Sequence, residues 1–155
     1  MRVTKDWSLR PGRAEDVEAV AELRAVVMRP DLERLGRYDP HRVRQRLRDG
    51  FSPAYTSIVE TRDGALAGCV TLRPDSGGDG LHLEHFYLAP GLQGRGLGTA
   101  VLARLSARAD AAGAVVRLAV LRGSAARRLY ERAGFTVEAE DGVDVFMVRK
   151  PAPAT

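Results

Sequence analysis

The spacing of apolar residues along the chain predicts a succession of helices and strands. Apolar residues that recur every three to four positions predict a helix, whereas short alternating or continuous apolar runs predict a strand. By these rules the helices lie at about 14–28, 40–48, 97–113 and 124–134. The strands lie at 7–10, 55–61, 65–73, 81–88, 115–121, 135–138 and 143–148.

The order of these elements predicts a single α/β (α+β) domain over residues 1–150, followed by a disordered tail at 151–155. The order is strand, two helices, three strands, helix, strand, helix and two strands. It favours a mixed, mostly antiparallel sheet of about seven strands with helices on both faces. The segment 81–121 contains a strand, a helix and a strand, and such a crossover makes the two strands parallel neighbours.

Local signals predict where several elements begin and end. Asp39 followed by Pro40 predicts the start of the second helix, because aspartate caps free N–H groups and proline suits a first turn. Pro30 is expected to end the first helix, since proline lacks the N–H that a regular helix uses. The segments 62–64 and 141–142 end in Asp-Gly and predict hairpin turns.

Composition narrows the class of protein. The 155 residues are 45% hydrophobic and 28% charged, which is typical of one globular domain. No apolar run reaches the ~18 residues of a membrane span, and residues 1–10 lack the apolar core of a signal peptide. The single cysteine, Cys69, excludes an internal disulfide and a multi-cysteine metal site, and no metal is predicted. These features together predict a cytoplasmic protein.

The net charge of +4 is carried almost entirely by arginine. Such a balance suits nucleic acid, an anionic cofactor rich in phosphate, or only a basic background. The positive charge is spread along the chain, and four arginines of the second helix lie two positions apart and so surround it. A solvated basic helix therefore explains them better than a binding stripe, and nucleic-acid binding stays an alternative.

The segment 93–98, Gln-Gly-Arg-Gly-Leu-Gly, follows the central strand 81–88 and opens a helix. Glycines allow sharp turns and close approach of a ligand, and the free N–H groups of a helix start bind anions. A nucleotide P-loop would need a lysine, which is absent between Lys5 and Lys150, and the dinucleotide fingerprint has a different glycine spacing. The His-x-Glu of zinc deaminases occurs at 82–84, but the cysteines that must follow it are absent.

In this segment the chain resembles the GCN5-related N-acetyltransferase (GNAT) superfamily, through the pattern Gln-x-x-Gly-x-Gly at 93–98. A second segment, 120–135 (VLRGSAARRLYERAGF), is similar to the late strand and helix of that superfamily. The resemblance also covers the order of the elements. It implies the GNAT fold and the binding of acetyl coenzyme A (acetyl-CoA).

The resemblance also implies which residues hold the cofactor. Backbone N–H groups of the glycine segment would bind the pyrophosphate, Arg95 would screen its charge, and Thr99 would add a hydroxyl. A bulge in the central strand would expose backbone groups that pair with the pantetheine amides. Ser124 replaces an asparagine common in relatives, which puts its contact with the cofactor in doubt. The expected cofactor-binding residues are Phe86, Tyr87, Leu88, Gln93, Gly94, Arg95, Gly96, Leu97, Gly98, Thr99 and Ser124. The alternative is that the glycines only pack the helix against the strand.

Acetyl transfer to an amine needs two proton-handling groups. An amine attacks the thioester only when unprotonated, and an acid helps the thiolate to leave. Tyr130 matches the tyrosine that serves as this acid in the superfamily; its alternative is an aromatic that packs on the sheet. Glu84 is the first choice for the base, and His82, His85 or water are alternatives. Strand alternation places His82 and Glu84 on one face and His85 on the other.

The predicted function is transfer of an acetyl group from acetyl-CoA to a primary amine of a small molecule or peptide, in a ternary complex. The alternatives are a non-catalytic acyl-CoA sensor and a basic nucleic-acid-binding domain. Neither a nucleic-acid nor a membrane partner is expected, and a homodimer is an allowed state. Arg29, Arg34 and Arg37 in the segment 28–38 would suit an acceptor that carries a carboxylate or phosphate.

Overall fold

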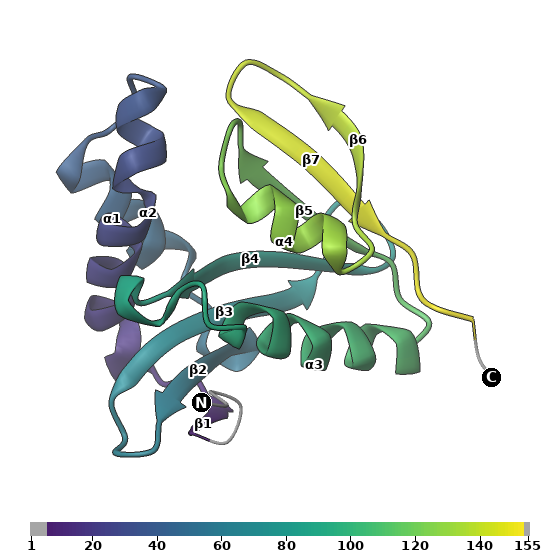
Figure 1. Ribbon diagram of the computed structural model, residues 1–155, viewed down its shortest axis with the longest axis horizontal. Coiled ribbons are helices and arrows are strands. Elements are labelled where there is room, and N and C mark those ends of the chain that lie inside the picture. Colours follow the sequence, from purple (N-terminus) through teal and green to yellow (C-terminus); the bar gives the residue numbers. More distant parts are fainter. Residues whose placement is uncertain (1–5, 154–155) are drawn as a thin grey trace. The chain divides into compact units, whose positions relative to one another are not determined.

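The computed structural model describes residues 6–153, and its element order is the one that the sequence predicts (Figure 1). The helices are α1 (Val17–Arg34), α2 (Pro40–Gly50), α3 (Leu97–Ala111) and α4 (Ala126–Arg132). The strands are β1 (Trp7–Pro11), β2 (Thr56–Thr61), β3 (Leu66–Pro74), β4 (Leu81–Leu88), β5 (Val116–Leu121), β6 (Thr136–Glu140) and β7 (Asp144–Arg149). The end of the predicted tail, residues 154–155, and residues 1–5 at the N-terminus lie outside the described residues.

The strands form a seven-stranded sheet with the hydrogen-bonded order β1-β2-β3-β4-β5-β7-β6. β1 with β2, β2 with β3, β5 with β7 and β6 with β7 are antiparallel pairs. β4 and β5 are parallel, with Leu81 opposite Val116 and His82 opposite Arg117. The predicted mixed, mostly antiparallel sheet and the predicted parallel crossover at 81–121 are therefore confirmed.

The chain divides into two compact units, and each is described by itself. The N-terminal unit contains the described residues up to Thr71 together with His85–Leu97. The C-terminal unit contains Leu72–Glu84 and the described residues from Gly98 onward. The division separates the first half of β4 from its second half. The prediction of one domain over 1–150 stays a prediction.

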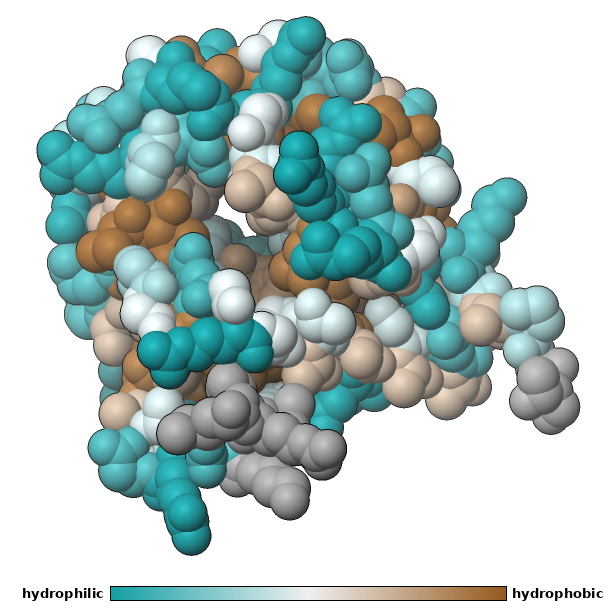
Figure 2. All heavy atoms as spheres, in the orientation of Figure 1, coloured by the Kyte–Doolittle hydropathy of each residue, from teal (hydrophilic) through white to brown (hydrophobic). Residues whose placement is uncertain are grey.

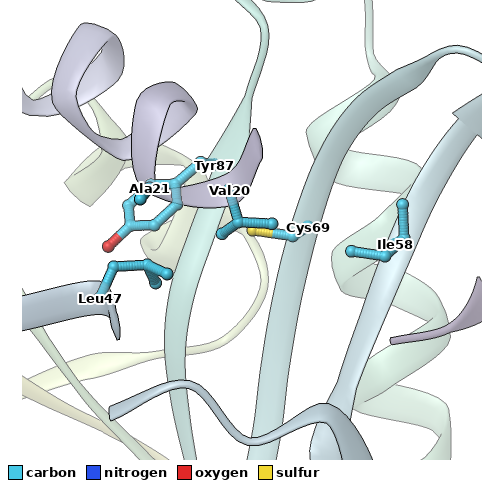
Figure 3. Packing of buried hydrophobic residues seen from close by; sticks show 6 residues of the cluster. All are labelled: Val20, Ala21, Leu47, Ile58, Cys69 and Tyr87. Atoms are coloured by element: carbon cyan, nitrogen blue, oxygen red, sulfur yellow. The ribbon is translucent and has the colours of Figure 1, made fainter. Parts of the chain in front are cut away.

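The core of the N-terminal unit is a cluster that draws one or two side chains from each of five elements (Figure 3). Its buried members are Val20, Ala21, Leu47, Ile58, Cys69 and Tyr87. Val20 and Ala21 lie on the same side of α1 as further, partly buried apolar residues of this helix, and this apolar side faces the core. Burying an aliphatic side chain of this size contributes about 1.5–3 kcal/mol.

The first helix differs from its prediction because Pro30 lies inside α1 and does not end it. Proline fixes φ near the helical value, and its missing N–H deprives only the carbonyl four residues earlier, on Val26. Val26 is 54% exposed, so this turn of the helix lies at the surface of the protein. The helix ends instead before Gly36, whose φ of +68° is the left-handed conformation that glycine adopts readily.

The second helix begins as predicted. The Asp39 carboxylate accepts hydrogen bonds from the backbone N–H groups of His41 and Arg42, both at 2.9 Å. Two of its arginines form ion pairs with glutamates of α1, Arg44 with Glu22 at 2.8 Å and Arg48 with Glu18 at 2.9 Å. Figure 2 shows hydrophilic side chains over much of the α1 and α2 surface. These pairs agree with a solvated basic helix.

The C-terminal unit buries one side of α3 and one face of its strands. α3 contributes Val101, Leu102, Leu105 and Ala109, and the strands contribute Val116, Leu118, Val120, Val145 and Met147. Burial alternates along β5, so Ala119 lies on the opposite, exposed face. A pair formed by Asp110 of α3 and Arg149 of β7, at 2.7 Å, joins the helix to the last strand. Among residues 6–153, none of the helices is long and apolar enough to cross a membrane.

Candidate active site

The glycine segment forms a turn between β4 and α3. The chain leaves β4 at Leu88, passes through a short 3-10 turn, and reaches Gly94 and Gly96, whose φ angles are +76° and +82°. A Cβ at either glycine would meet no atom within 4 Å. These two glycines are therefore required by the backbone conformation and not by close packing, which counts against the alternative that they only pack helix against strand.

This turn has the chemistry of an anion site. The first N–H groups of α3, which begins at Leu97, have no partner within the helix, and the positive end of its dipole lies there. Arg95 and Thr99 are exposed. The Gln93 side chain donates a hydrogen bond to the Leu88 carbonyl at 2.9 Å and so ties the turn to the end of the strand. Such a turn can hold a pyrophosphate through backbone N–H groups.

The central strand β4 is irregular at His85. Its φ of +49° makes it the one non-glycine residue with positive φ in the described part of the chain. Leu83 and Tyr87 are buried as strict alternation requires, but His85 between them is half-buried and Leu88 beside Tyr87 is buried, so the alternation fails from His85 onward. An irregularity is where the resemblance implies a bulge, and a conformation that is rare outside glycine suggests a functional constraint.

The residues after His85 approach β3 closely. A Cβ on Gly68 of β3 would clash with the carbonyl oxygen of Tyr87 and would lie 2.8 Å from a methyl group of Leu88. Tyr87 and Leu88 are buried, and Phe86 is half-buried. The side chain of Tyr87 belongs to the core, so a role for this segment in cofactor binding uses its backbone. Gly68 is a residue that the sequence analysis missed.

A polar network lies beside this core in the N-terminal unit. Arg24 of α1 donates a hydrogen bond from Nε to the Tyr87 hydroxyl at 2.9 Å and another from Nη1 to the Val43 carbonyl. His85 Nδ1 lies 3.1 Å from the same hydroxyl. The sequence analysis missed Arg24, although its position three and four residues after Ala21 and Val20 places it on the apolar side of the helix.

Cys69 contacts the irregular strand from β3. Its thiol donates to the His85 carbonyl at 3.1 Å. Burial raises the pKa of this thiol to about 12, because an apolar environment disfavours the thiolate. Cys69 is therefore a core residue and not a nucleophile at neutral pH.

Glu84 lies in the C-terminal unit and is bound by Arg73. Arg73 Nε and Nη2 lie 2.7 Å and 3.3 Å from the two carboxylate oxygens, and this contact raises the pKa of Arg73. His82 Nε2 lies 3.7 Å from Glu84, so these two side chains lie together as alternation predicts. Arg73 is a second residue that the sequence analysis missed, because a hydrophobic pattern identifies the face of a strand but not the partner across it.

Tyr130 and Ser124 also lie in the C-terminal unit. Tyr130 of α4 is 7% exposed, and its ring meets that of Phe135 edge to face at 5.8 Å. Ser124 Oγ accepts a hydrogen bond from the backbone N–H of Ala126 at 3.2 Å. Ser124 precedes Ala125, the N-cap residue of α4, which makes no side-chain cap bond, and the Ser124 hydroxyl proton stays available as a donor.

The irregular strand β4, the glycine turn that follows it and the start of α3 are together typical of proteins that bind a phosphate-containing ligand at such a turn. Comparison with known proteins identifies the class. The "Acetyltransferase (GNAT) family" matches residues 17–135. The chain belongs to this family, which confirms the resemblance, the N-acetyltransferase class and acetyl-CoA as the cofactor.

Solved structures support the fold. PaiA N-acetyltransferase from Thermoplasma acidophilum in complex with coenzyme A is 22% identical, with a TM-score of 0.74 over 93% of this chain and 98% of that one. N-acetylglutamate synthase from Neisseria gonorrhoeae, complexed with coenzyme A and L-arginine, is 22% identical, with a TM-score of 0.68 over 96% of this chain and 34% of that one. A spermidine N-acetyltransferase chimera from Vibrio cholerae and hSSAT is 18% identical, with a TM-score of 0.69 over 94% and 95% of the two chains. None of the curated proteins matches the sequence significantly.

Proposed function

We propose that the chain transfers the acetyl group of acetyl-CoA directly to a primary amine of a small molecule or peptide in a ternary complex. The observation that carries this proposal is the turn with positive φ at Gly94 and Gly96 that leads into α3. In a chain of the GNAT family, this turn holds the pyrophosphate through backbone N–H groups from Gln93 to Gly98. Arg95 screens the phosphate charge, and Thr99 and Ser124 contribute hydroxyls.

The pantetheine arm pairs with the backbone of Phe86, Tyr87 and Leu88. The positive φ at His85 turns the strand at the residue before this segment. A ligand that adds to a strand edge in this way gains hydrogen bonds that depend little on side chains. The carbonyl carbon of the thioester is then attacked by the amine nitrogen, the C–S bond breaks, and an amide and free coenzyme A result.

Glu84 is the proposed base that takes a proton from the amine. Its carboxylate accepts two hydrogen bonds from Arg73, which orient it. The same ion pair competes with the amine proton, so we expect proton transfer through an intervening water or at the outer lone pair of an oxygen. His82, 3.7 Å away, can pass the proton to solvent.

His85 is a poorer candidate for the base because of its hydrogen-bonded neighbours. Arg24 only donates, so it occupies a lone pair of the Tyr87 hydroxyl, and its charge makes that hydroxyl a stronger donor. This hydroxyl lies 3.1 Å from Nδ1 of His85, so Nδ1 already has a hydrogen-bond partner in the protein. A base that takes the amine proton through Nδ1 would have to give up this contact.

Tyr130 is the proposed acid that protonates the departing thiolate. Its burial on α4 limits the rotamers of the ring, which suits a group that must be held in position. The alternative role, packing alone, uses the ring and its contact with Phe135 but not the hydroxyl. Removal of the hydroxyl therefore distinguishes the two roles.

The direct test is release of free coenzyme A thiol from acetyl-CoA with a panel of amines, beside thermal unfolding with and without acetyl-CoA. Acetyl-CoA at a hundred times its Kd should stabilise the native state by about 2.7 kcal/mol. Stabilisation without thiol release for any amine would indicate a non-catalytic sensor. An absence of stabilisation, combined with salt-sensitive binding of nucleic acid, would refute the proposal.

The wider predictions of cytoplasmic location, of an allowed homodimer and of no nucleic-acid or membrane partner stay predictions. The ion pairs of Arg44 and Arg48 with glutamates of α1 support the absence of a nucleic-acid stripe on α2.

A further inference from the structure

Arg24 is a buried cation without a carboxylate partner among the described residues. Its exposed fraction is 8%, and its hydrogen bonds go to two neutral groups, the Tyr87 hydroxyl and the Val43 carbonyl. Burying a charge without an opposite charge is costly, and neutral acceptors compensate it only in part. A guanidinium kept in this state is suited to an anion that arrives from outside the protein.

One end of the Arg24 guanidinium is directed to solvent. The hydrogen bonds of Arg24 use Nε and Nη1. Within the described residues, Nη2 of Arg24 is not among the fully buried side-chain atoms that lack a hydrogen bond. The Nη2 group of Arg24 is therefore not sealed in the core and reaches solvent. The hydrogen bonds of Nε and Nη1 hold the guanidinium plane in one orientation. Nη2 can therefore bind an anion without a further loss of side-chain entropy.

The arginines that the sequence favoured for an acidic acceptor lie in different surroundings. Arg29 lies 3.4 Å from the carboxylate of Glu33, and Arg34 forms an ion pair with Asp31. The side chains of Arg29 and Arg34 are 57% and 45% exposed. An exposed cation that already has a carboxylate neighbour gains little from a second anion, because water and the neighbour compete.

We propose that Arg24 binds a carboxylate of the acceptor, so that the substrates are amines that also carry a carboxylate. This inference rests on the proposed N-acetyltransferase function and adds the class of acceptor. Nη2 donates a charge-assisted hydrogen bond to a carboxylate oxygen, in a partly buried site where such a bond is stronger than in water. The interaction orients the acceptor and does not take part in the transfer of the acetyl group.

The test compares two acceptors that differ in one group, an amino acid and its carboxamide, in the wild type and in Arg24→Gln. In the wild type, kcat/KM should be about tenfold to a hundredfold higher for the acid, the range that one charge-assisted hydrogen bond gives. In Arg24→Gln this ratio should fall to near one through loss on the acid alone, and Arg24→Lys should retain part of it. The Kd of coenzyme A should not change in either variant.

Arg44→Gln is the matched control. Arg44 also joins the two helices, through its ion pair with Glu22 of α1, but its side chain is 28% exposed and has a carboxylate partner. It should keep the acid-to-amide ratio of the wild type. Aminoethyl phosphate beside ethanolamine supplies a second pair of acceptors, and a larger preference for the phosphate than for the carboxylate would overturn the assignment of a carboxylate.

Other outcomes separate this inference from the proposed function. A wild-type ratio near one, or an equal loss on acid and amide in Arg24→Gln, would assign Arg24 a structural role while acetyl transfer stands. A weaker Kd for coenzyme A with an unchanged ratio would assign it to the cofactor. If no amine releases thiol, the proposed function fails. The anion site can then still be tested, because amino acids should raise the thermal stability of the wild type but not of Arg24→Gln. If Arg24→Gln does not fold, the wild-type ratio and Arg24→Lys decide.

Discussion

Gly96→Ala should weaken cofactor binding with a cost that the backbone geometry sets. Gly96 has a φ of +82°, and a Cβ placed there would meet no atom within 4 Å. Alanine is therefore not excluded by packing, and the cost is the left-handed conformation, about 1–2 kcal/mol for a residue with a Cβ. The strain lowers the free energy of unfolding by up to about this amount. Relaxation of the strained turn moves the N–H groups away from the phosphate, so the Kd for acetyl-CoA rises by up to about thirtyfold, the equivalent of 2 kcal/mol.

Two other glycines separate backbone strain from cofactor contact. Gly64 has a φ of +85° in the β2–β3 hairpin, also with open space around a Cβ, so Gly64→Ala carries the same strain outside the glycine turn. Gly91 lies in the 3-10 turn before Gly96, with open space around a Cβ, and its φ is not left-handed. Gly64→Ala should lose stability but keep the Kd, whereas Gly91→Ala should change neither.

The assays are urea unfolding for the free energy and calorimetric titration with acetyl-CoA for the Kd, on the wild type and all three variants. Gly96→Ala should be distinguished by its Kd and not by its stability alone. An equal and small change of the Kd in Gly96→Ala and Gly64→Ala would refute the reasoning, because the turn would then have no special part in phosphate binding.

Three further predictions concern the proposed chemistry and one ion pair. Tyr130→Phe should lower kcat by about a hundredfold or more, the usual contribution of a general acid, and leave the Kd of acetyl-CoA unchanged; a normal kcat would remove the hydroxyl from the mechanism. Glu84→Gln should remove the acidic limb of the pH–rate profile, and an unmoved profile would assign the base to water or a histidine. Arg149 and the Ala152 N–H hold the pKa of Asp110 at about 2, below its ordinary value of 3.8. Because the folded pKa is the lower one, this pair stabilises the protein above pH 4 and is lost as the pH falls toward 2, so in urea unfolding the stability difference between wild type and Asp110→Asn should shrink over that window; a constant difference would contradict it.

Local patterns in the sequence were sufficient for the elements that bracket the site. The predicted bounds of β4 match the structure, since a strand that begins with alternating apolar and polar residues ends at an Ala-Pro-Gly segment. The cap of α2 at Asp39 and the hairpin at Gly64 depend on chemistry within a few residues, and both are confirmed. The remaining strand bounds shift by a residue or two, as hydrogen bonding across neighbours decides them.

The sequence could not predict features that depend on contacts between distant residues. Pro30 continues α1 because the carbonyl it deprives lies at an exposed position, which is a tertiary property. The positive φ of His85 has no local signal, as histidine rarely takes this conformation and nothing nearby in sequence requires it. The pairing of Glu84 of β4 with Arg73 of β3 depends on which residues lie side by side on neighbouring strands, so the ion pair of the candidate base has no signal in the sequence. Each of these features lies outside the reach of periodicity and spacing.

The basic composition has a local explanation in the structure. Within residues 6–153, arginines of several elements form ion pairs with carboxylates of other elements. These pairs include Arg10 with Asp16 and Glu60, Arg44 with Glu22, Arg48 with Glu18, Arg73 with Glu84, Arg117 with Glu138 and Arg149 with Asp110. Net charge is therefore a poor guide to the ligand of this chain, because much of the positive charge is already neutralised within the fold. Recognition of an anionic ligand depends instead on a cation that the ligand can reach.

Arg95 in the glycine turn and Arg24 beside the core are the two cations to which we assign such a role. If the first serves the pyrophosphate and the second a carboxylate, then loss of Arg95 should weaken the Kd of acetyl-CoA alone, and loss of Arg24 should change acceptor preference alone.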